Sequence, residues 1–311
     1  MRAIAAGHLR LHLKAVGAVV SETAAPSTAR LPAAALDLLE RCRSVTTPCG
    51  EGAMVWRCWG EGRPVVLLHG GSGSWTHWIR NIPALLANGC QVWAPDLPGF
   101  GDSAPPPSGS DADAVVPPLS AGMRALLGHG PHDIAAFSFG SLVAVLLAVE
   151  QPELVSRLLL TGPPVLPLPH GRGVALPAAR SNMTPQARAD AHRAGLAAIM
   201  IHQPDLIDDD TLALQTANVM RDRMRSRKLV TTDACARAVR ALHCEFECVW
   251  GGHDVLCQDR WAEVFATCEA NPLCARTALI PGAGHWVQYE QAEAFNRLLT
   301  TWARHGGTPA S

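Results

Sequence analysis

The sequence predicts an α/β protein built on a mostly parallel sheet with helices on both faces. From about residue 53, short apolar runs typical of buried strands alternate with segments whose apolar residues recur at helical spacing. This alternation is typical of a parallel sheet, because each crossover between parallel strands usually carries a helix. The chain of 311 residues is 48% hydrophobic and 17% charged, so it can build a sizeable packed core.

Six segments are predicted to form strands. They are short and mainly apolar, and residues 64–68 form a β-branched run that ends at His-Gly-Gly. Helices are expected between them wherever apolar residues recur three or four positions apart. The predicted strands are 64–68, 91–94, 133–137, 157–161, 246–250 and 277–280, and the predicted helices are 75–88, 141–150 and 292–304.

The alternation stops after the fourth predicted strand. Between residues 163 and 243 we predict only amphipathic helices, at 185–200 with Thr184 as N-cap and at 211–227. We therefore expect a helical cap or lid at 163–243, inserted between two parts of one core at 31–162 and 244–311. Residues 1–30 are expected to be a flexible extension. They carry basic residues, as targeting segments do, but their apolar stretches are interrupted more often than those of a secretory signal. An export or transit signal is the alternative.

Composition and charge disfavour several classes of protein. The formal net charge is −1 with no long basic block, which disfavours binding to nucleic acid. The longest apolar run is far shorter than the about 20 residues of a membrane span. The 10 cysteines are scattered, so we interpret them as reduced thiols, and the Cys244/Cys248 pair lacks the neighbours of a zinc site. We expect a cytoplasmic protein with no metal or organic cofactor, and a homodimer stays open.

The most informative motif is AFSFG at residues 136–140, between a predicted strand and a predicted helix. It is typical of a nucleophile elbow, where a serine at a strained turn projects its hydroxyl above the sheet. The positions two before and two after the serine must be small for strand and helix to pass closely. Ala136 stands where glycine is usual and adds one methyl group. Ser138 is therefore the candidate nucleophile.

A serine nucleophile needs a histidine as base and a carboxylate to orient it. Asp254 follows the strand 246–250, and His285 follows the strand 277–280. Each comes after the carboxyl end of a strand, where ligands bind in open α/β sheets. The chain order Ser, Asp, His therefore predicts a catalytic triad, with Asp259 as the second choice for the acid.

The glycine-rich segment HGGSGS at 69–74 offers backbone amides beside the predicted nucleophile. No P-loop lysine follows these glycines, which argues against phosphate binding. We assign the oxyanion hole to the amides of Gly71 and Phe139. We expect His69 to be structural, and His77 and His253 to lie at the surface or behind the site.

With these motifs the chain from about residue 50 to 305 resembles the α/β-hydrolase superfamily. Further resemblance lies in DLPGFGDS at 96–103, GGHD at 251–254 and GAGHW at 282–286. The resemblance implies an α/β-hydrolase fold with a helical cap, and places the chain near esterases, lactonases, haloperoxidases and carbon–carbon hydrolases. Relatives that act on epoxides or haloalkanes use an aspartate nucleophile, so Ser138 implies acyl transfer.

The segment GHWVQYE at 284–290 also resembles that of hydrolases that cleave meta-cleavage products, which are vinylogous diketones. In that resemblance Trp286 would pack on the substrate. Those enzymes carry asparagine before the nucleophile, where this chain has Phe137, and this departure weakens the carbon–carbon interpretation. They also bind a substrate carboxylate with a cap arginine. Candidates by position are Arg221, Arg223 and Arg225, although an exposed arginine-rich helix face explains them better.

The sequence therefore predicts a serine hydrolase acting on a small-molecule substrate, a largely apolar carboxylic ester. Trp75, Phe137 and Trp286 are the predicted substrate contacts, because apolar side chains at strand ends favour an apolar or aromatic acyl group. The alternatives are a carbon–carbon hydrolase and a ligand-binding member of the fold without catalysis.

Overall fold

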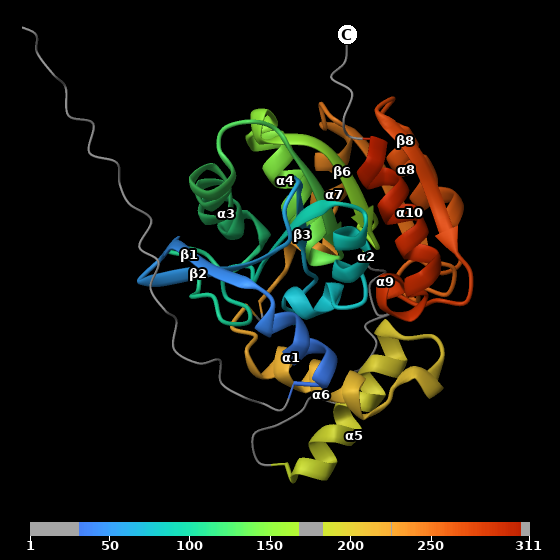
Figure 1. The fold of residues 1–311 in the computed structure, drawn as a ribbon. Helices are drawn as coiled ribbons and strands as arrows, with labels where there is room; N and C mark the ends of the chain where they lie inside the picture. The colour runs from blue at the N-terminus through green and yellow to red at the C-terminus, as the bar shows by residue number, and fades with distance from the viewer. Residues whose placement is uncertain (1–30, 168–182, 225, 306–311) are drawn as a thin grey trace, which may run out of the picture.

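The computed structural model describes residues 31–167, 183–224 and 226–305, and it shows the predicted α/β architecture (Figure 1). Its centre is an eight-stranded sheet in the order β1-β2-β4-β3-β5-β6-β7-β8. The strands from β4 to β8 along this order pair in parallel, whereas β1 with β2 and β2 with β4 are antiparallel. The strands are β1 (Arg43–Cys49), β2 (Gly52–Trp59), β3 (Arg63–Leu68), β4 (Cys90–Pro95), β5 (His132–Phe137), β6 (Val155–Thr161), β7 (Glu245–Gly251) and β8 (Cys274–Ile280).

Side chains of the central strands alternate between two hydrophobic cores, one on each face of the sheet. In β3, Val66 and Leu68 belong to one core, and Val65 and Leu67 to the other. Alternation follows from the two-residue period of a strand, and burial of both faces explains why these strands are continuously apolar.

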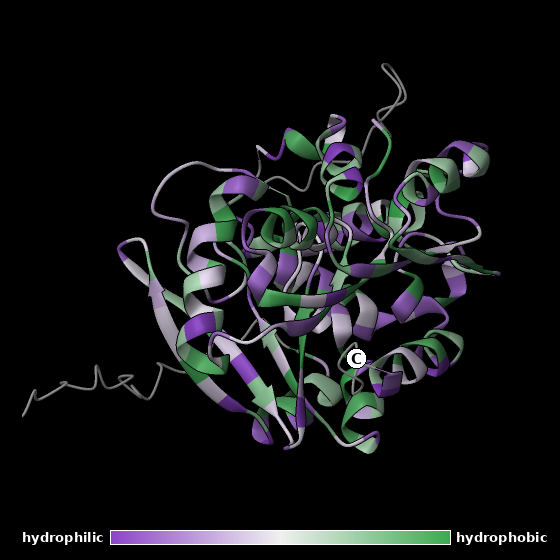
Figure 2. Cartoon of the chain, turned by 90° about the horizontal axis from the view of Figure 1, so that it is seen from above, coloured by the Kyte–Doolittle hydropathy of each residue, from purple (hydrophilic) through white to green (hydrophobic). Residues whose placement is uncertain are grey.

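Helices cover both cores, as the sequence predicts. Apolar residues lie mainly along the inner elements, and polar ones mark the outer faces of the helices (Figure 2). The first core holds α3 (Ala112–Leu127), α4 (Phe139–Glu150), α7 (Ala234–Arg240) and α8 (Trp261–Glu269), and the second holds α1 (Ala33–Glu40), α2 (Ile82–Ala87), α9 (Val287–Glu290) and α10 (Ala292–His305).

The predicted helix at 75–88 is in fact two short pieces. Residues Trp75–Trp78 form a 3₁₀ turn capped by the Ser74 side chain, and α2 begins only at Ile82. Pro83 occupies the first turn of α2, where a missing N–H costs nothing, but it cannot continue a helix from residue 75. The continuous helix was therefore a wrong prediction.

A helical segment leaves the sheet after β6 and returns at α7. We call its described residues, 163–167 and 183–233 without Arg225, the cap. It contains α5 (Pro185–Gly195), a π-helical turn (Leu196–Met200), α6 (Asp209–Met220) and 3₁₀ turns at Pro204–Leu206 and Leu229–Thr231. Thr184 caps α5 as predicted, its hydroxyl accepting a 3.2 Å hydrogen bond from the Ala187 amide.

The helix predicted at 211–227 ends at Met220, so its second half was wrong. Residues 221–224 and 226–228 instead run irregularly across the core, where the Arg223 amide donates to the Gly99 carbonyl (2.9 Å). Tertiary hydrogen bonds thus replace the last helical turns.

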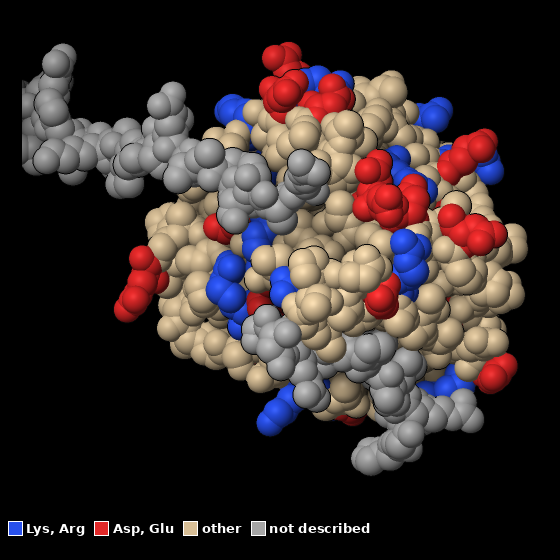
Figure 3. All heavy atoms as spheres, turned by 90° about the horizontal axis from the view of Figure 1, so that it is seen from below, with Lys and Arg blue, Asp and Glu red and all other residues tan. Residues whose placement is uncertain are grey.

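The face on the cap side carries small acidic and basic groups scattered over a mainly neutral surface (Figure 3). No helix within the described ranges is long and apolar enough to cross a membrane.

Candidate active site

Ser138 lies at the sharp turn between β5 and α4. Its φ of +51° and ψ of −113° are rare for a residue with a side chain, as a nucleophile elbow requires. A Cβ on Gly140 would lie 2.5 Å from the carbonyl oxygen of His69, so only glycine lets α4 pass this close to the end of β3. The elbow is fixed from the other side by a 2.8 Å hydrogen bond from the Ser138 amide to the carbonyl of Thr161.

The loops after β7 and β8 bring Asp254 and His285 to Ser138. His285 Nδ1 lies 2.6 Å from Asp254 Oδ2, and His285 Nε2 lies 2.9 Å from Ser138 Oγ. Asp254 Oδ1 accepts a 3.0 Å hydrogen bond from the Leu256 amide. A carboxylate only accepts, so Nδ1 of His285 carries the proton and Nε2 is free to accept the proton of Ser138. Asp259 is exposed, with a φ of +67°.

Glu290 joins the loop of His285 to the cap. Its carboxylate accepts hydrogen bonds from the amides of Gly284 (2.7 Å), His202 (3.0 Å) and Gln203 (2.6 Å). Gly284 directly precedes His285, whereas the other two residues follow the π-helical turn of the cap. One buried side chain therefore fixes the position of both segments.

The two predicted oxyanion donors lie beside Ser138. Phe139 is the first residue of α4, where the amide lacks a partner within the helix and the helix dipole favours negative charge. Gly71 lines the pocket next to Ser138. His69 supports the turn before Gly71: Nε2 accepts from the Leu97 amide (2.8 Å) and Nδ1 donates to the Gly70 carbonyl (2.8 Å). Both ring nitrogens of His69 are thus used structurally, as expected.

A cavity of about 300 Å³ opens over Ser138 between the core and the cap. Apart from Ser138 and His285, its lining is mostly apolar and contains one charged side chain, that of Arg227. The remaining lining residues are Gly71, Phe139, Gly162, Pro163, Pro164, Leu166, Ile199, Met200, Val230, Leu256 and Cys257.

The predicted substrate contacts lie behind this cavity rather than on its wall. Trp75, Phe137 and Trp286 are all buried, and none is among the lining residues. The Phe137 ring packs against His285, with centroids 5.0 Å apart, and Trp286 stacks on Tyr289 at 4.0 Å. His77, expected at the surface or behind the site, is buried against Phe137 and Trp286, whereas His253 is exposed and stacks on His202.

Arg221 and Arg223, two of the three cap arginines named from the sequence, bind core residues and are not among the lining residues of the cavity. Arg221 pairs with Asp102 (2.8 Å), and Arg223 donates to the carbonyls of Gly101 (3.2 Å) and Ser103. The side chain of Arg225 lies outside the described residues. Sequence reasoning missed Arg227, which sits in an irregular segment without any motif.

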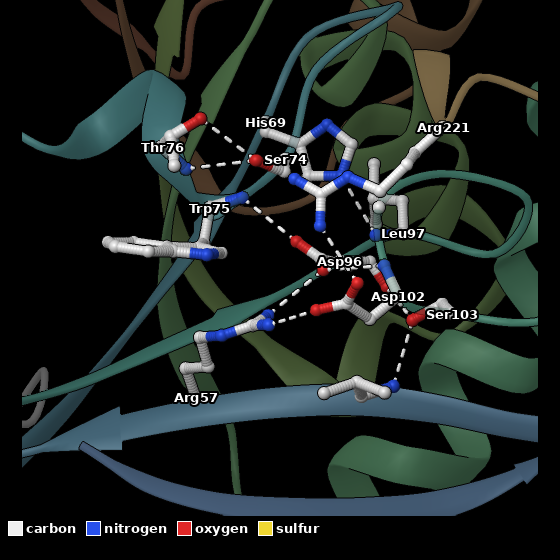
Figure 4. Close-up of polar contacts among 12 residues, drawn as sticks. Arg57, His69, Ser74, Trp75, Thr76, Asp96, Leu97, Asp102, Ser103 and Arg221 are labelled. Carbon is white, nitrogen blue, oxygen red and sulfur yellow. Dashed lines mark hydrogen bonds and ion pairs between the residues drawn. The ribbon is translucent and has the colours of Figure 1, made fainter. Parts of the chain in front are cut away.

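A largely buried charge network connects β2, the loop after β4 and the cap (Figure 4). Arg57 of β2 binds Asp96 (2.9 Å) and Asp102, and Asp102 also binds Arg221 at the end of α6. Burial pushes the pKa of Asp96 upward, but the charge of Arg57 and the hydrogen bond from the Asp102 amide outweigh this effect, so the pKa is lowered. The network therefore ties the loop after β4 to both the sheet and the cap. The described residues contain no group of three or more His, Cys, Asp or Glu that could hold a metal ion.

The chain is similar to known hydrolases in sequence and fold. A 2-hydroxy-6-oxo-6-phenylhexa-2,4-dienoate hydrolase of Burkholderia cepacia is 27% identical over 266 residues, covering 79% of this chain and 90% of the relative. The meta-cleavage product hydrolase CumD of Pseudomonas fluorescens IP01 superposes with a TM-score of 0.66 at 23% identity, covering 86% of this chain and 100% of that one.

A thermophilic esterase of Thermogutta terrifontis also superposes, with a TM-score of 0.62 at 19% identity, covering 86% of this chain and 100% of the esterase. At this level of identity the two solved structures show the fold alone. The alpha/beta hydrolase family model matches residues 65–298, which include all three residues of the predicted triad. This chain belongs to the alpha/beta hydrolase family and is a hydrolase.

Proposed function

We propose that this protein is a serine hydrolase that cleaves a small, largely apolar carboxylic ester. The observation that carries the proposal is the continuous hydrogen-bonded series from Asp254 through His285 to Ser138, with heavy-atom distances of 2.6 and 2.9 Å. Such a series occurs where a serine must be deprotonated during attack. It opens into a cavity whose mostly apolar wall suits an apolar substrate.

The proposed reaction follows from the positions of these groups. Ser138 Oγ attacks the ester carbonyl while His285 Nε2 takes its proton, and the amides of Gly71 and Phe139 stabilise the oxyanion. His285 then gives the proton to the leaving alcohol, which leaves an acyl group on Ser138. Water, deprotonated by His285, releases the acid. Asp254 orients His285 and stabilises its charged form in both steps.

Cleavage of a carbon–carbon bond in a meta-cleavage product is the second candidate. Two observations favour it: several curated relatives carry that activity in their names, and Arg227 offers the cavity a cation for a substrate carboxylate. Phe137 argues against carbon–carbon cleavage, because a buried apolar ring stands where the resemblance predicts an asparagine. The ester remains the first choice for this reason.

We keep the cytoplasm as the proposed location of the protein and leave open whether it forms a homodimer.

The test is to assay the purified protein and its Ser138→Ala variant against p-nitrophenyl esters of increasing acyl length. A 2-hydroxy-6-oxo-dienoate is assayed in parallel. We expect ester cleavage that falls by about 10⁴-fold or more in Ser138→Ala, as removal of a triad residue does elsewhere. A strong preference for the dienoate would establish the second candidate. Ester cleavage that survives in Ser138→Ala would refute the triad. No turnover of either class, with binding retained, would indicate a ligand-binding protein.

A further inference from the structure

The loop that carries the Gly71 amide is unusually poor in side chains. Residues 70–73 read Gly-Gly-Ser-Gly, so Ser72 supplies the only side chain that could hold them. Glycine has the largest conformational freedom of any residue, and such a loop would sample many positions if left alone. An oxyanion donor stabilises the transition state only if its position is fixed in advance. Contacts from outside the loop must therefore fix Gly71.

Core residues hold the two flanking glycines. The Gly70 amide donates to His77 Nδ1 (3.2 Å), so this amide is not available to a substrate. The edge of the His77 ring also lies against the loop, since a Cβ on Gly73 would lie 2.2 Å from its Cε1. These contacts fix both ends of the Gly70–Gly73 segment on the side facing the sheet.

Cap residues hold the loop from the opposite side, through Ser72. Ser72 has a φ of +49°, a conformation that non-glycine residues rarely adopt. Its hydroxyl donates to Asp222 Oδ2 (2.6 Å) and accepts from Arg227 Nη2 (3.0 Å). Asp222 also pairs with Arg227 Nη1 (2.8 Å), which makes a closed triangle of Ser72, Asp222 and Arg227.

The triangle is rigid and anchored. Asp222 Oδ1 accepts from the Met224 amide (2.8 Å), and Arg227 donates to the Met224 carbonyl (2.7 Å). Burial alone would raise the pKa of Asp222. The Arg227 charge and the hydrogen bond from Ser72 lower this pKa by more than burial raises it, so the carboxylate stays charged. A second cap contact follows two residues along the loop, where Ser74 Oγ donates to Asn218 Oδ1 (2.6 Å).

We propose that the cap completes the oxyanion hole, with Ser72 and Asp222 as positioning residues for the Gly71 amide. The inference rests on the proposed serine hydrolase mechanism. In it the cap does more than cover the substrate: the closed triangle holds Gly71 where the oxyanion forms, while His77 holds the neighbouring glycines. Arg227 also lines the cavity, so its loss would mix positioning with substrate contact, and the tests use the other two residues.

The experiment measures kcat and KM for the best p-nitrophenyl ester in Ser72→Ala, Ser72→Gly and Asp222→Asn. We expect kcat to fall about 10- to 100-fold in Ser72→Ala, because displacing a catalytic group by about 1 Å can cost 100-fold in rate. KM should change less than about threefold. Ser72→Gly relieves the backbone strain but removes the hydroxyl, so it should lose kcat as well. A kcat in Ser72→Gly equal to that of wild type would overturn the proposal.

A second readout reports on the oxyanion directly. A trifluoromethyl ketone forms a hemiketal with Ser138 whose oxyanion occupies the hole, whereas the matching methyl ketone adds to serine far less readily. The inhibition constant of the trifluoromethyl ketone should rise in parallel with the loss of kcat in Ser72→Ala and Asp222→Asn, and that of the methyl ketone should not. Parallel weakening of both inhibitors would indicate general damage to the pocket and refute the proposal.

Arg223→Met is the matched control. It removes hydrogen bonds from the same cap segment to the neighbouring loop, at Gly101 and Ser103, without touching residues 70–74. It should lower the thermal midpoint but leave kcat within about twofold. The double variant Ser72→Ala/Asp222→Asn should lose no more kcat than its worse single variant, because both act through one triangle. Additive losses would overturn the shared role.

The failure of this inference differs from the failure of the proposed function. If ester cleavage depends on Ser138 but kcat is unchanged in Ser72→Ala, the mechanism stands and the positioning role falls. If cleavage does not depend on Ser138, the proposed function falls first.

Discussion

Replacing Asp254 by asparagine should lower kcat about 10⁴-fold at neutral pH, because the surrounding hydrogen bonds dictate how the amide must sit. The Leu256 amide donates to Asp254 Oδ1, so an asparagine keeps its carbonyl oxygen there. Its NH₂ group then faces His285 Nδ1, which lies 2.6 Å from Oδ2 in the wild type. Nδ1 must become the acceptor and Nε2 must carry the proton, so His285 can no longer take the proton of Ser138.

The size of the effect follows from that tautomer change. In other hydrolases, the same exchange in a serine triad leaves the geometry intact and costs about 10⁴-fold in kcat. This corresponds to about 5 kcal/mol of lost transition-state stabilisation. Asp254 is fully buried, so water cannot replace the missing carboxylate.

The assay compares kcat of the purified variant with wild type on an ester that the wild type cleaves. Circular dichroism and the thermal midpoint verify that the fold is retained. Asp259→Asn is the matched control, since Asp259 is exposed and asparagine tolerates its left-handed backbone. Activity of Asp254→Asn within tenfold of wild type would refute the reasoning, and so would an equal loss in Asp259→Asn.

Two further predictions concern stability. Arg57→Met should lower the free energy of unfolding in urea by about 3–5 kcal/mol, because Asp96 would be left buried and charged without its partner. The control Arg297→Met breaks an exposed ion pair and should lower it by about 1 kcal/mol or less. Similar losses in the two variants would contradict the role of the network. Burial lowers the pKa of His77 well below its ordinary 6.5, so only the unfolded chain takes up this proton as the pH falls below about 6.5. Acidification therefore lowers the free energy of unfolding, by up to about 1.4 kcal/mol per pH unit from this group. Urea unfolding between pH 7 and 5 should show that the free energy of unfolding falls less steeply with pH in His77→Asn than in wild type. An equal dependence on pH in the two proteins would exclude this contribution.

Five of the six strands that the sequence predicts, β3 to β7, are buried along most of their length, whereas the sixth, β8, lies at the sheet edge and is mostly exposed or half-buried. β3 and β5 each end in a run of four or more apolar residues, which is why they stand out from the loops around them. The hairpin of β1 and β2 was not predicted, because β1 lies at the sheet edge, is half polar and contains Pro48. Helix α3 was hidden by Pro117 and Pro118, which remove two backbone donors, and it persists because its apolar face packs in the first core.

The candidate site divides in the same way. Ser138 and His285 sit in short motifs whose local geometry the sequence dictates, and the structure places them within hydrogen-bond distance. Asp222 and Arg227 lie in an irregular cap segment, and only tertiary contacts bring them to the loop of Ser72. Trp75 was predicted to contact the substrate, but an aromatic side chain after a strand can face either a cavity or the core. Here it packs against Trp59, and the sequence alone does not distinguish the two positions.

The anchoring of the cap by Glu290 has a consequence for synthesis on the ribosome. The cap residues His202 and Gln203 leave the exit tunnel well before Glu290, the side chain that holds them and the loop of His285. A nascent chain can build the sheet from β1 to β6 and the elbow of Ser138 while the cap still lacks this anchor. The site therefore assembles only after the segment with His285 and Glu290 has left the tunnel, so a nascent chain that ends before this segment carries no activated serine.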